Sequence, residues 1–185
     1  ALVHVEGDLA VVHVVQLPVE RDPVAADGGD GAALRLAGVV IRRGQDDLRG
    51  IKMAIEEANA KGGVLGRKVT WTTADTETTP ATGSRIAERF ITREDCTILI
   101  GAIHSGVANA ITQVAAKYGV IYLNTNSSAP SEAGENCSRI KFVWDGNGTN
   151  FSKASVKNAV DSIGKNWMLL TNDYVWGHTT SAATK

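Results

Sequence analysis

The feature that most constrains the fold of this chain is a strand–helix–strand unit over Thr97–Asn124. A short apolar run at Thr97–Ile100 is typical of a strand, and apolar residues at helical spacing follow from Val107 onward. Gly119 ends that helix, and Val120–Leu123 has the character of a second strand. A crossover of this length normally joins parallel strands in a right-handed sense, so the unit predicts an α/β fold with a parallel sheet.

Two loops leave the carboxyl ends of these predicted strands, namely Gly101–Gly106 and Asn124–Pro130. Both consist largely of small, hydroxyl and amide residues. Because ligands of open parallel sheets bind outside the carboxyl ends of the strands, we expect a binding site between the two loops. In the second loop, Asn126, Ser127 and Ser128 offer hydrogen-bond donors and acceptors, although an ordinary polar turn has the same composition.

His104 and Ser105 in the first loop suggest a base and a nucleophile, but their spacing argues against hydrolysis. A nucleophile elbow has glycines two residues before and after the serine, where this chain has Ile103 and Val107. Adjacent side chains also diverge. Instead, backbone N–H groups at the helix start, with the Ser105 hydroxyl, are suited to hold a carboxylate or carbonyl oxygen. Simple capping of the helix by Ser105 is an equal alternative, and the two roles can coexist.

A third polar loop, Asn172–His178, follows Trp167–Thr171, which we predict to be a buried strand. Its aromatic residues Tyr174 and Trp176 can pack against the apolar part of a ligand and offer a hydroxyl or an indole N–H. Packing in the protein core explains these two residues equally well.

Composition and motifs exclude several classes of function. The 185 residues carry a net charge of −1, and no basic stripe indicates nucleic acid. The glycine motifs of nucleotide-binding loops and histidine pairs at metal-ligand spacing are not found, so we expect no catalytic residue, cofactor or metal. Cys96 and Cys137 lie 41 positions apart without a CxxC pair, and could form one disulfide or remain two buried thiols.

The rest of the chain from Asp46 alternates helices and strands. We expect helices over residues 46–59, 81–92, 151–163 and from 179 onward, strands over 68–74 and 140–144, and a polar loop over 131–138.

Residues 1–44 differ from the rest, because they contain no Lys, Ser, Thr, Asn, Phe, Tyr, Trp or Cys. Within them, Val3–Val15 is rich enough in valine to form a strand, whereas Asp22–Gly31 is turn-like. The segment lacks the basic start and unbroken apolar stretch of a signal peptide. It is either a genuine β-rich segment or a product of a wrong reading frame or of cloning, and we favour the second interpretation.

From about Asp46 to Lys185 the chain closely resembles the type I periplasmic binding proteins. Within them it is similar to the branched-chain amino acid and amide group of ABC-transporter solute-binding proteins. The motifs that carry this resemblance are LRGIKMAIEEANAKGGVLGRKV at Leu48–Val69, the unit at Thr97–Asn124 with its NTNSSAP loop, and NDYVWG at Asn172–Gly177. The resemblance implies two α/β lobes, each built on a parallel sheet, with the ligand in the cleft between them.

The resemblance also implies a division of the chain and a role for individual residues. Residues 1–44 are the atypical segment, 45–139 form lobe one, 140–150 form the first crossover, and 151–185 begin lobe two. Ser105 and its loop, with His104, match the segment that holds a ligand's α-carboxylate and ammonium. Asn126 and Ser128 match the second loop of that lobe, and Trp176, with Tyr174 nearby, matches the aromatic residue contributed by lobe two.

Proteins of this family are not enzymes. They close on a small solute in the periplasm and then dock on an ABC permease in the inner membrane. By resemblance we expect this chain to belong to such a protein, with an amino acid, amide or urea-like solute as its ligand. The alternatives are the ligand-sensing domain of a receptor or regulator with the same fold, and an α/β hydrolase that depends on Ser105.

Two departures from the family lead to further expectations. The family has a Gly/Thr-rich loop just before its first helix, where Ala37–Gly44 here reads AGVVIRRG, and its second lobe continues well beyond Lys185. We therefore expect a fragment without an export signal, which exposes the inner face of an unfinished lobe and is poorly stable. In the exported protein we expect Cys96 and Cys137 to pair.

Overall fold

The computed structural model describes residues 11–15, 36–37 and 42–185, with side chains from residue 47 onward. Most of Val3–Val15 and all of Asp22–Gly31 therefore lie outside the described residues. In chain order the elements are β1 (Val11–Val15), β2 (Leu36–Ala37), α1 (Arg42–Ala60), β3 (Trp71–Asp75), α2 (Pro80–Arg93), β4 (Ile98–Gly101), α3 (Ser105–Tyr118), β5 (Ile121–Asn124), α4 (Pro130–Ala133), β6 (Lys141–Val143), α5 (Gly148–Ile163) and α6 (Val175–Thr184).

The sheet places the carboxyl ends of four strands at one edge. Strands β4 and β5 are parallel neighbours, as the sequence predicts, and β6 lies parallel to β5 on its other side. Strand β1 runs antiparallel to both β3 and β4, so β3 points in the same direction as β4. The loops that follow β3, β4, β5 and β6 consequently begin at the same edge, and two of them are the loops in which we expect the ligand site.

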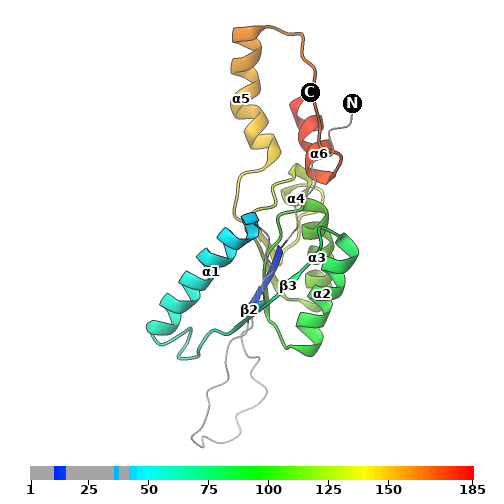
Figure 1. The fold of residues 1–185 in the computed structure, drawn as a ribbon. Coiled ribbons are helices and arrows are strands. Elements are labelled where there is room, and N and C mark those ends of the chain that lie inside the picture. The colour runs from blue at the N-terminus through cyan, green and yellow to red at the C-terminus, as the bar shows by residue number, and fades with distance from the viewer. Residues whose placement is uncertain (1–10, 16–35, 38–41) are drawn as a thin grey trace, which may run out of the picture.

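Helix α1 covers one face of the sheet (Figure 1). Its buried Ile55 packs with Val69 and with the partly buried Ile51 and Ile100. The helix ends where the sequence predicts, because the Asn59 amide donates to the Val69 carbonyl at 2.9 Å and accepts from the Val69 N–H at 2.7 Å. These two hydrogen bonds hold the segment that precedes β3 against the end of α1.

Helices α2 and α3 cover the opposite face of the sheet and form the main core (Figure 1). Phe90, Leu99, Ile111 and Tyr122 are fully buried there. Leu99 and its neighbour Ile100 point to opposite faces, as successive residues of a strand do, so each helical layer receives its own apolar side chains. Helix α3 ends at the predicted Gly119, which adopts the left-handed conformation with φ 68°.

Helices α5 and α6 pack against each other, and α6 also contacts α4 (Figure 1). The prediction of a buried strand at Trp167–Thr171 is wrong. The segment has no strand partner, and Met168 and Leu170 are 90% and 95% exposed. Strand conformation needs a neighbouring strand to satisfy its backbone hydrogen bonds, and the described residues provide none beside this segment.

The contact between α2 and α3 depends on a glycine. A Cβ atom on Gly83 would lie 2.7 Å from Cγ1 of the fully buried Val107, well inside normal contact distance. We expect Gly83→Val to lower the unfolding free energy by about 1–3 kcal/mol through overpacking. Urea unfolding measures the change. The matched control is Gly50→Val in α1, where nothing lies within 4 Å of the added atom, and similar losses in both variants would contradict the prediction.

Candidate functional site

The loop from β4 to α3 has an unusual backbone at the predicted site. Gly101 and Ala102 both have positive φ angles, 116° and 73°. Ala102 is fully buried, and a non-glycine residue in this region carries strain that its surroundings must hold. The hydroxyl of Tyr122 on β5 contributes, because it donates to the Gly101 carbonyl at 2.9 Å. The loop is thus held rigidly against the neighbouring strand.

His104 caps the helix that follows this loop. Its Nδ1 accepts from the backbone N–H groups of Gly106 and Val107 at 3.2 and 3.4 Å, and its carbonyl accepts from Ala108 N–H at 2.9 Å. Nδ1 therefore carries no proton. The expectation that Ser105 caps this helix is wrong. The N–H groups that we expected to hold a carboxylate already have a partner within the chain.

Ser105 instead belongs to a buried polar network. Its Oγ lies 3.0 Å from Oγ of Ser127, and Ser127 also donates to the Glu132 carboxylate. Asn124 Nδ2 donates to the other carboxylate oxygen, and Ala129 N–H approaches the first at 3.4 Å. Glu132 lies in the short helix α4, where we had predicted a polar loop. The network joins α3, β5 and α4.

Lys141 on β6 lies near this network as a buried cation. Lys141 is only 8% exposed, and its Nζ has no hydrogen-bond partner among the described residues. Burial lowers the pKa of Lys141, and the charges of Glu132 and Cys137 partly oppose this effect. The pKa of Tyr122 lies well above its usual value, first because of burial and then because of the Glu132 charge.

Aromatic side chains at the start of α6 meet the loop between β4 and α3. Tyr174 stacks on His104 with ring centroids 4.8 Å apart and an angle of 27°, and Trp176 follows Tyr174 at 6.2 Å. His104 and Tyr174 are 70 positions apart in the sequence, so the fold brings them together. Trp176 also lines a pocket of about 170 Å³ on α6, and its indole N–H is buried without a hydrogen-bond partner among the described residues.

The predicted residues Asn126 and Ser128 lie on the loop between β5 and α4, and both are partly buried. The Ser128 carbonyl accepts from Gly148 N–H at 2.9 Å, which joins this loop to the start of α5. On the same loop, Thr125 Oγ1 donates to Asp47 of α1 at 3.2 Å. The loop therefore contacts both α1 and the start of α5.

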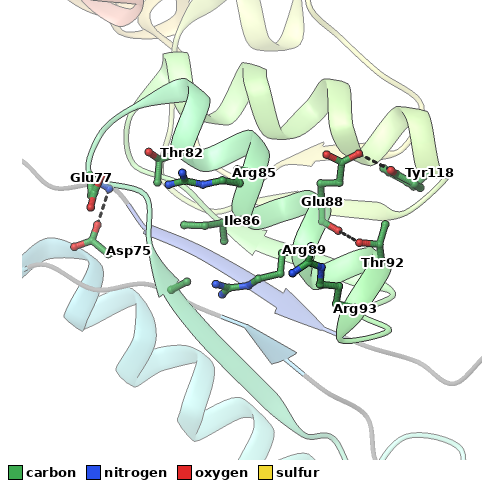
Figure 2. Close-up of a pocket in the computed structure, with 11 residues that line it drawn as sticks. Asp75, Glu77, Thr82, Arg85, Ile86, Glu88, Arg89, Thr92, Arg93 and Tyr118 are labelled. Atoms are coloured by element: carbon green, nitrogen blue, oxygen red, sulfur yellow. Dashed lines mark hydrogen bonds between the residues drawn. The ribbon is translucent and has the colours of Figure 1, made fainter.

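A separate hollow lies elsewhere, along α2 (Figure 2). It measures about 620 Å³ and contains none of the predicted site residues. Three arginines at four-residue intervals, Arg85, Arg89 and Arg93, line it together with Asp75 and Glu77 at the end of β3. These charged side chains are exposed to solvent, whereas the predicted site combines buried polar groups with aromatic rings. We therefore place the candidate site at the loops.

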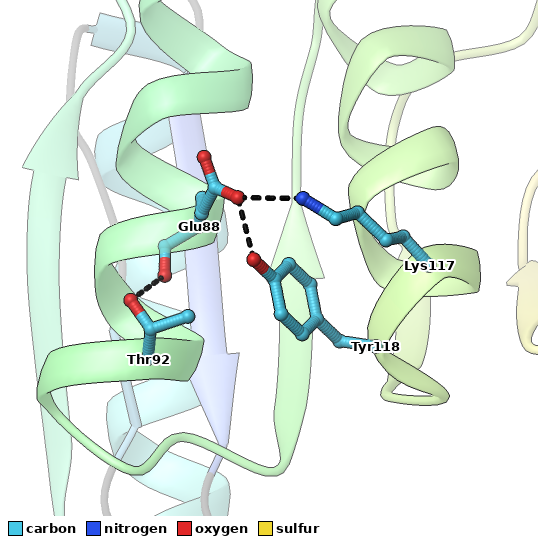
Figure 3. Close-up of polar contacts among 4 residues, drawn as sticks. All are labelled: Glu88, Thr92, Lys117 and Tyr118. Carbon is cyan, nitrogen blue, oxygen red and sulfur yellow. Dashed lines mark hydrogen bonds and ion pairs between the residues drawn. The ribbon is translucent and has the colours of Figure 1, made fainter.

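Surface polar contacts at the same hollow join α2 to α3 (Figure 3). Glu88 accepts from the Tyr118 hydroxyl and from Lys117 Nζ at 2.9 Å. The Tyr118 hydrogen bond, followed by Lys117, lowers the pKa of Glu88. These contacts order the surface between the two helices and leave the candidate site unaffected.

The predicted disulfide is the next feature to compare with the structure. The pairing of Cys96 with Cys137 is not seen: Cys96 is buried in the core, Cys137 is exposed, and the structure has them as separate thiols. Within the described ranges, no group of His, Cys, Asp and Glu is arranged to hold a metal ion. In the same part of the chain, no helix is both long and apolar enough to cross a membrane.

Sequence reasoning missed Glu132 and Lys141. A signal for Glu132 was present, because Pro130 at the first position and glutamate at the third position are typical of a helix start. The sequence contains no comparable signal for Lys141, because one lysine at the start of a short strand is usually solvated. Its burial appears only in the folded structure.

Comparison with known proteins identifies the family. Residues 31–185 match the sequence profile described as periplasmic binding protein. The chain belongs to the periplasmic binding protein family. The match begins inside the segment of unusual composition and includes both lobe-one loops and the aromatic residues of lobe two.

Individual family members support the same assignment. Leu/Ile/Val-binding protein homolog 7 of Brucella abortus (strain 2308) is 33% identical over 125 residues, which are 67% of this chain and 31% of that protein. The chain thus spans about a third of the length of the curated relatives it matches.

Solved structures of periplasmic binding proteins confirm the predicted fold. One from Burkholderia mallei aligns with a TM-score of 0.71 at 27% identity, over 76% of this chain and 37% of that chain. A solute-binding protein from R. palustris, solved in complex with benzoate, aligns with a TM-score of 0.67 at 23% identity, over 76% and 39%. The α/β fold of type I periplasmic binding proteins is therefore present here in part.

The cap on α3 predicts a pH dependence of stability. Burial lowers the pKa of His104 below its usual 6.5, so the unfolded chain binds this proton more readily. The stability that neutral His104 contributes is complete above a pH of about 6.5 and is lost as the pH falls through the lowered folded-state value.

Urea unfolding midpoints between pH 7.5 and pH 5 measure this effect. His104→Asn is the matched variant, because asparagine is a good helix cap that does not titrate. We expect the wild-type chain to lose more stability on acidification than the variant. The same pH dependence in both proteins would contradict the role of His104.

Proposed function

We propose that the intact protein is the solute-binding component of an ABC importer. It binds an amino acid, amide or urea-like molecule in a cleft between two lobes and delivers it to a permease in the inner membrane. Lobe one spans residues 45–139, residues 140–150 form the first crossover, and lobe two begins at residue 151. The protein works in the periplasm, is not an enzyme and uses no cofactor.

The observation that carries this proposal is the stacking of Tyr174 on His104. It brings an aromatic side chain from the start of lobe two to the edge of the lobe-one sheet. A solute held there would contact polar groups from one lobe and an apolar aromatic surface from the other, which is the usual composition of a small-molecule site. Family membership independently supports a solute as the ligand.

Within this site we assign separate roles to the two lobes. Asn126, Ser128 and Ser105 contact the polar end of the solute from lobe one. Tyr174 and Trp176 pack against its apolar part, and the unpartnered Trp176 indole N–H is available as a donor. Because the rings and the loops belong to different lobes, a bound solute holds the lobes together.

A panel of solutes tests the proposal on the intact protein. L-amino acids, acetamide, urea and benzoate are added singly, and the melting temperature is measured. We expect at least one N–H-bearing compound to raise it by several degrees, because ligand at 100 times its Kd adds about 2.7 kcal/mol to the unfolding free energy. No shift with any member of the panel would contradict solute binding.

The role of Trp176 is tested by a conservative change. We expect Trp176→Phe to weaken binding of the best solute by about tenfold or more, since it removes the indole N–H and part of the apolar surface. Isothermal titration calorimetry measures the Kd. Trp71→Phe, at the amino end of β3 and remote from the loops, is the matched control and should bind as the wild type does. Equal effects of the two changes would refute the assignment.

A further inference from the structure

One face of α2 carries a row of positive charge. Arg85, Arg89 and Arg93 are exposed, line the hollow of about 620 Å³ along this helix, and extend from the same side of it (Figure 2). Residues four positions apart lie one above the other on a helix, about 6 Å apart along its axis, so this arginine row is about 12 Å long. A linear row is suited to several anionic groups rather than to one.

Most of this charge is not neutralised by the chain itself. In the part of the chain that the structure describes, Arg85 and Arg93 make no hydrogen bond or ion pair. Arg89 has an ion pair there, between its Nε and Glu94 Oε1 at 3.1 Å. A guanidinium has five N–H donors in a fixed fork that matches a carboxylate, so all three side chains retain donors for a partner.

The acidic residues of the hollow do not cancel the arginine row. Glu88 accepts from Lys117 Nζ at 2.9 Å and from the Tyr118 hydroxyl, so its carboxylate is committed to α3 (Figure 3). Asp75 and Glu77 lie at the end of the hollow where α2 begins, and neither forms an ion pair with the described arginines (Figure 2). The hollow therefore has a negative end and, beyond it, a positive row.

This arrangement argues against several anionic partners. A single phosphate needs donors that converge on one point, whereas these arginines lie in a line. A flat anionic membrane would meet Asp75 and Glu77 together with the arginine row, and these two carboxylates would repel it. Two copies of the chain that met symmetrically through α2 would place arginine opposite arginine. The anionic groups of a partner must therefore form a row with matching spacing.

An acidic helix meets this condition, because every α-helix rises by the same distance, about 6 Å, over four residues. We propose that the arginine row of α2 binds a helix of a partner protein in which carboxylates recur at positions i, i+4 and i+8. This surface contains none of the candidate solute-site residues, so it is a second, protein-binding function of the chain.

The negative end of the hollow sets the orientation of the partner helix. If that helix runs antiparallel to α2, its last turn lies beside Asp75 and Glu77. Basic residues are favoured in the last turn of a helix, because the helix dipole is negative there, and they would pair with these two carboxylates. Exposed ion pairs are individually weak and are screened by salt, so the complex is transient and salt-sensitive.

A pair of synthetic peptides tests the proposal on the intact protein. The acidic peptide is an alanine-rich helix of about 20 residues, long enough to be helical in water, with three glutamates at four-residue intervals and two lysines in its last turn. The control peptide has the same composition, with its glutamates spread around the helix. Fluorescence anisotropy of the dye-tagged peptides measures each Kd.

We expect the wild-type protein to bind the acidic peptide at least about tenfold more tightly than the control peptide. Its affinity should fall at least about fivefold between about 0.05 M and about 0.5 M salt, because the contacts are charge pairs at an exposed surface. Both measurements use the unaltered protein and do not depend on the folding of any variant.

Neutralising the row provides the second test. Changing all three residues, by Arg85→Gln, Arg89→Gln and Arg93→Gln, should weaken the acidic peptide about tenfold or more, since each exposed charge pair contributes a factor of about two to five. The matched control removes three exposed cations outside the hollow and should bind within about twofold of the wild type. Its changes are Arg139→Gln, Lys153→Gln and Lys165→Gln. Melting temperatures establish that both variants are folded.

Reversing the charge distinguishes a lost contact from a damaged protein. The variant with Arg85→Glu, Arg89→Glu and Arg93→Glu should lose the acidic peptide. It should instead bind a peptide in which lysine replaces each glutamate and glutamate replaces each lysine. A protein that failed to fold would bind neither peptide, whereas an exchange of specificity requires the row itself.

Four results would overturn the inference. The wild-type protein could bind both peptides equally, or the glutamine variant could retain the wild-type affinity. A peptide with glutamates at alternate positions and prolines between them, which cannot form a helix, could bind as tightly as the helical one. Finally, the row could be required for binding phosphatidylglycerol vesicles or for self-association while the acidic peptide is not bound. None of these measurements involves the solute, so none bears on the proposed function.

Discussion

The carboxylate of Glu132 is the buried charge around which the polar edge of the sheet is organised. Its position in α4 brings it beneath the loop that follows β5, where Asn124, Ser127 and Ala129 donate to it. A buried carboxylate without such donors would cost several kcal/mol, so this loop has little freedom to move. Through Ser127 the constraint extends to Ser105 at the start of α3. The loop after β5 and the start of α3, which are separate in the sequence, are thereby held next to each other.

The start of α3 illustrates how a helix N-terminus can be occupied by its own chain. Such a terminus is usually suited to anions, because its first N–H groups have no partner within the helix. Here His104 fills that role with a ring nitrogen, and the same ring carries Tyr174 on its face. The His104 side chain therefore both caps α3 and stacks on Tyr174, and its protonation affects both interactions.

Helices α5 and α6 bury fewer residues than helices α2 and α3. Helices α5 and α6 pack closely where Gly148 meets Thr180, since a Cβ on that glycine would lie 2.1 Å from Thr180 Oγ1. Yet Ile163, at the end of the predicted helix over residues 151–163, is 78% exposed, and Met168 and Leu170 are 90% and 95% exposed. Periodicity identifies an apolar face, but burial requires a surface to receive it. Lobe one meets this condition because its sheet is covered on both faces.

The sequence by itself determined the local elements and the family of this protein. Strand and helix periods, Gly119 and Asn59 predicted where the lobe-one elements lie, because those signals act within a few residues of the backbone. Only the tertiary structure decided which groups the site can offer. It joined Ser105 to Ser127, stacked Tyr174 on His104, and left Trp167–Thr171 exposed. Each outcome depends on a partner distant in sequence or on the lack of one, which no local pattern contains.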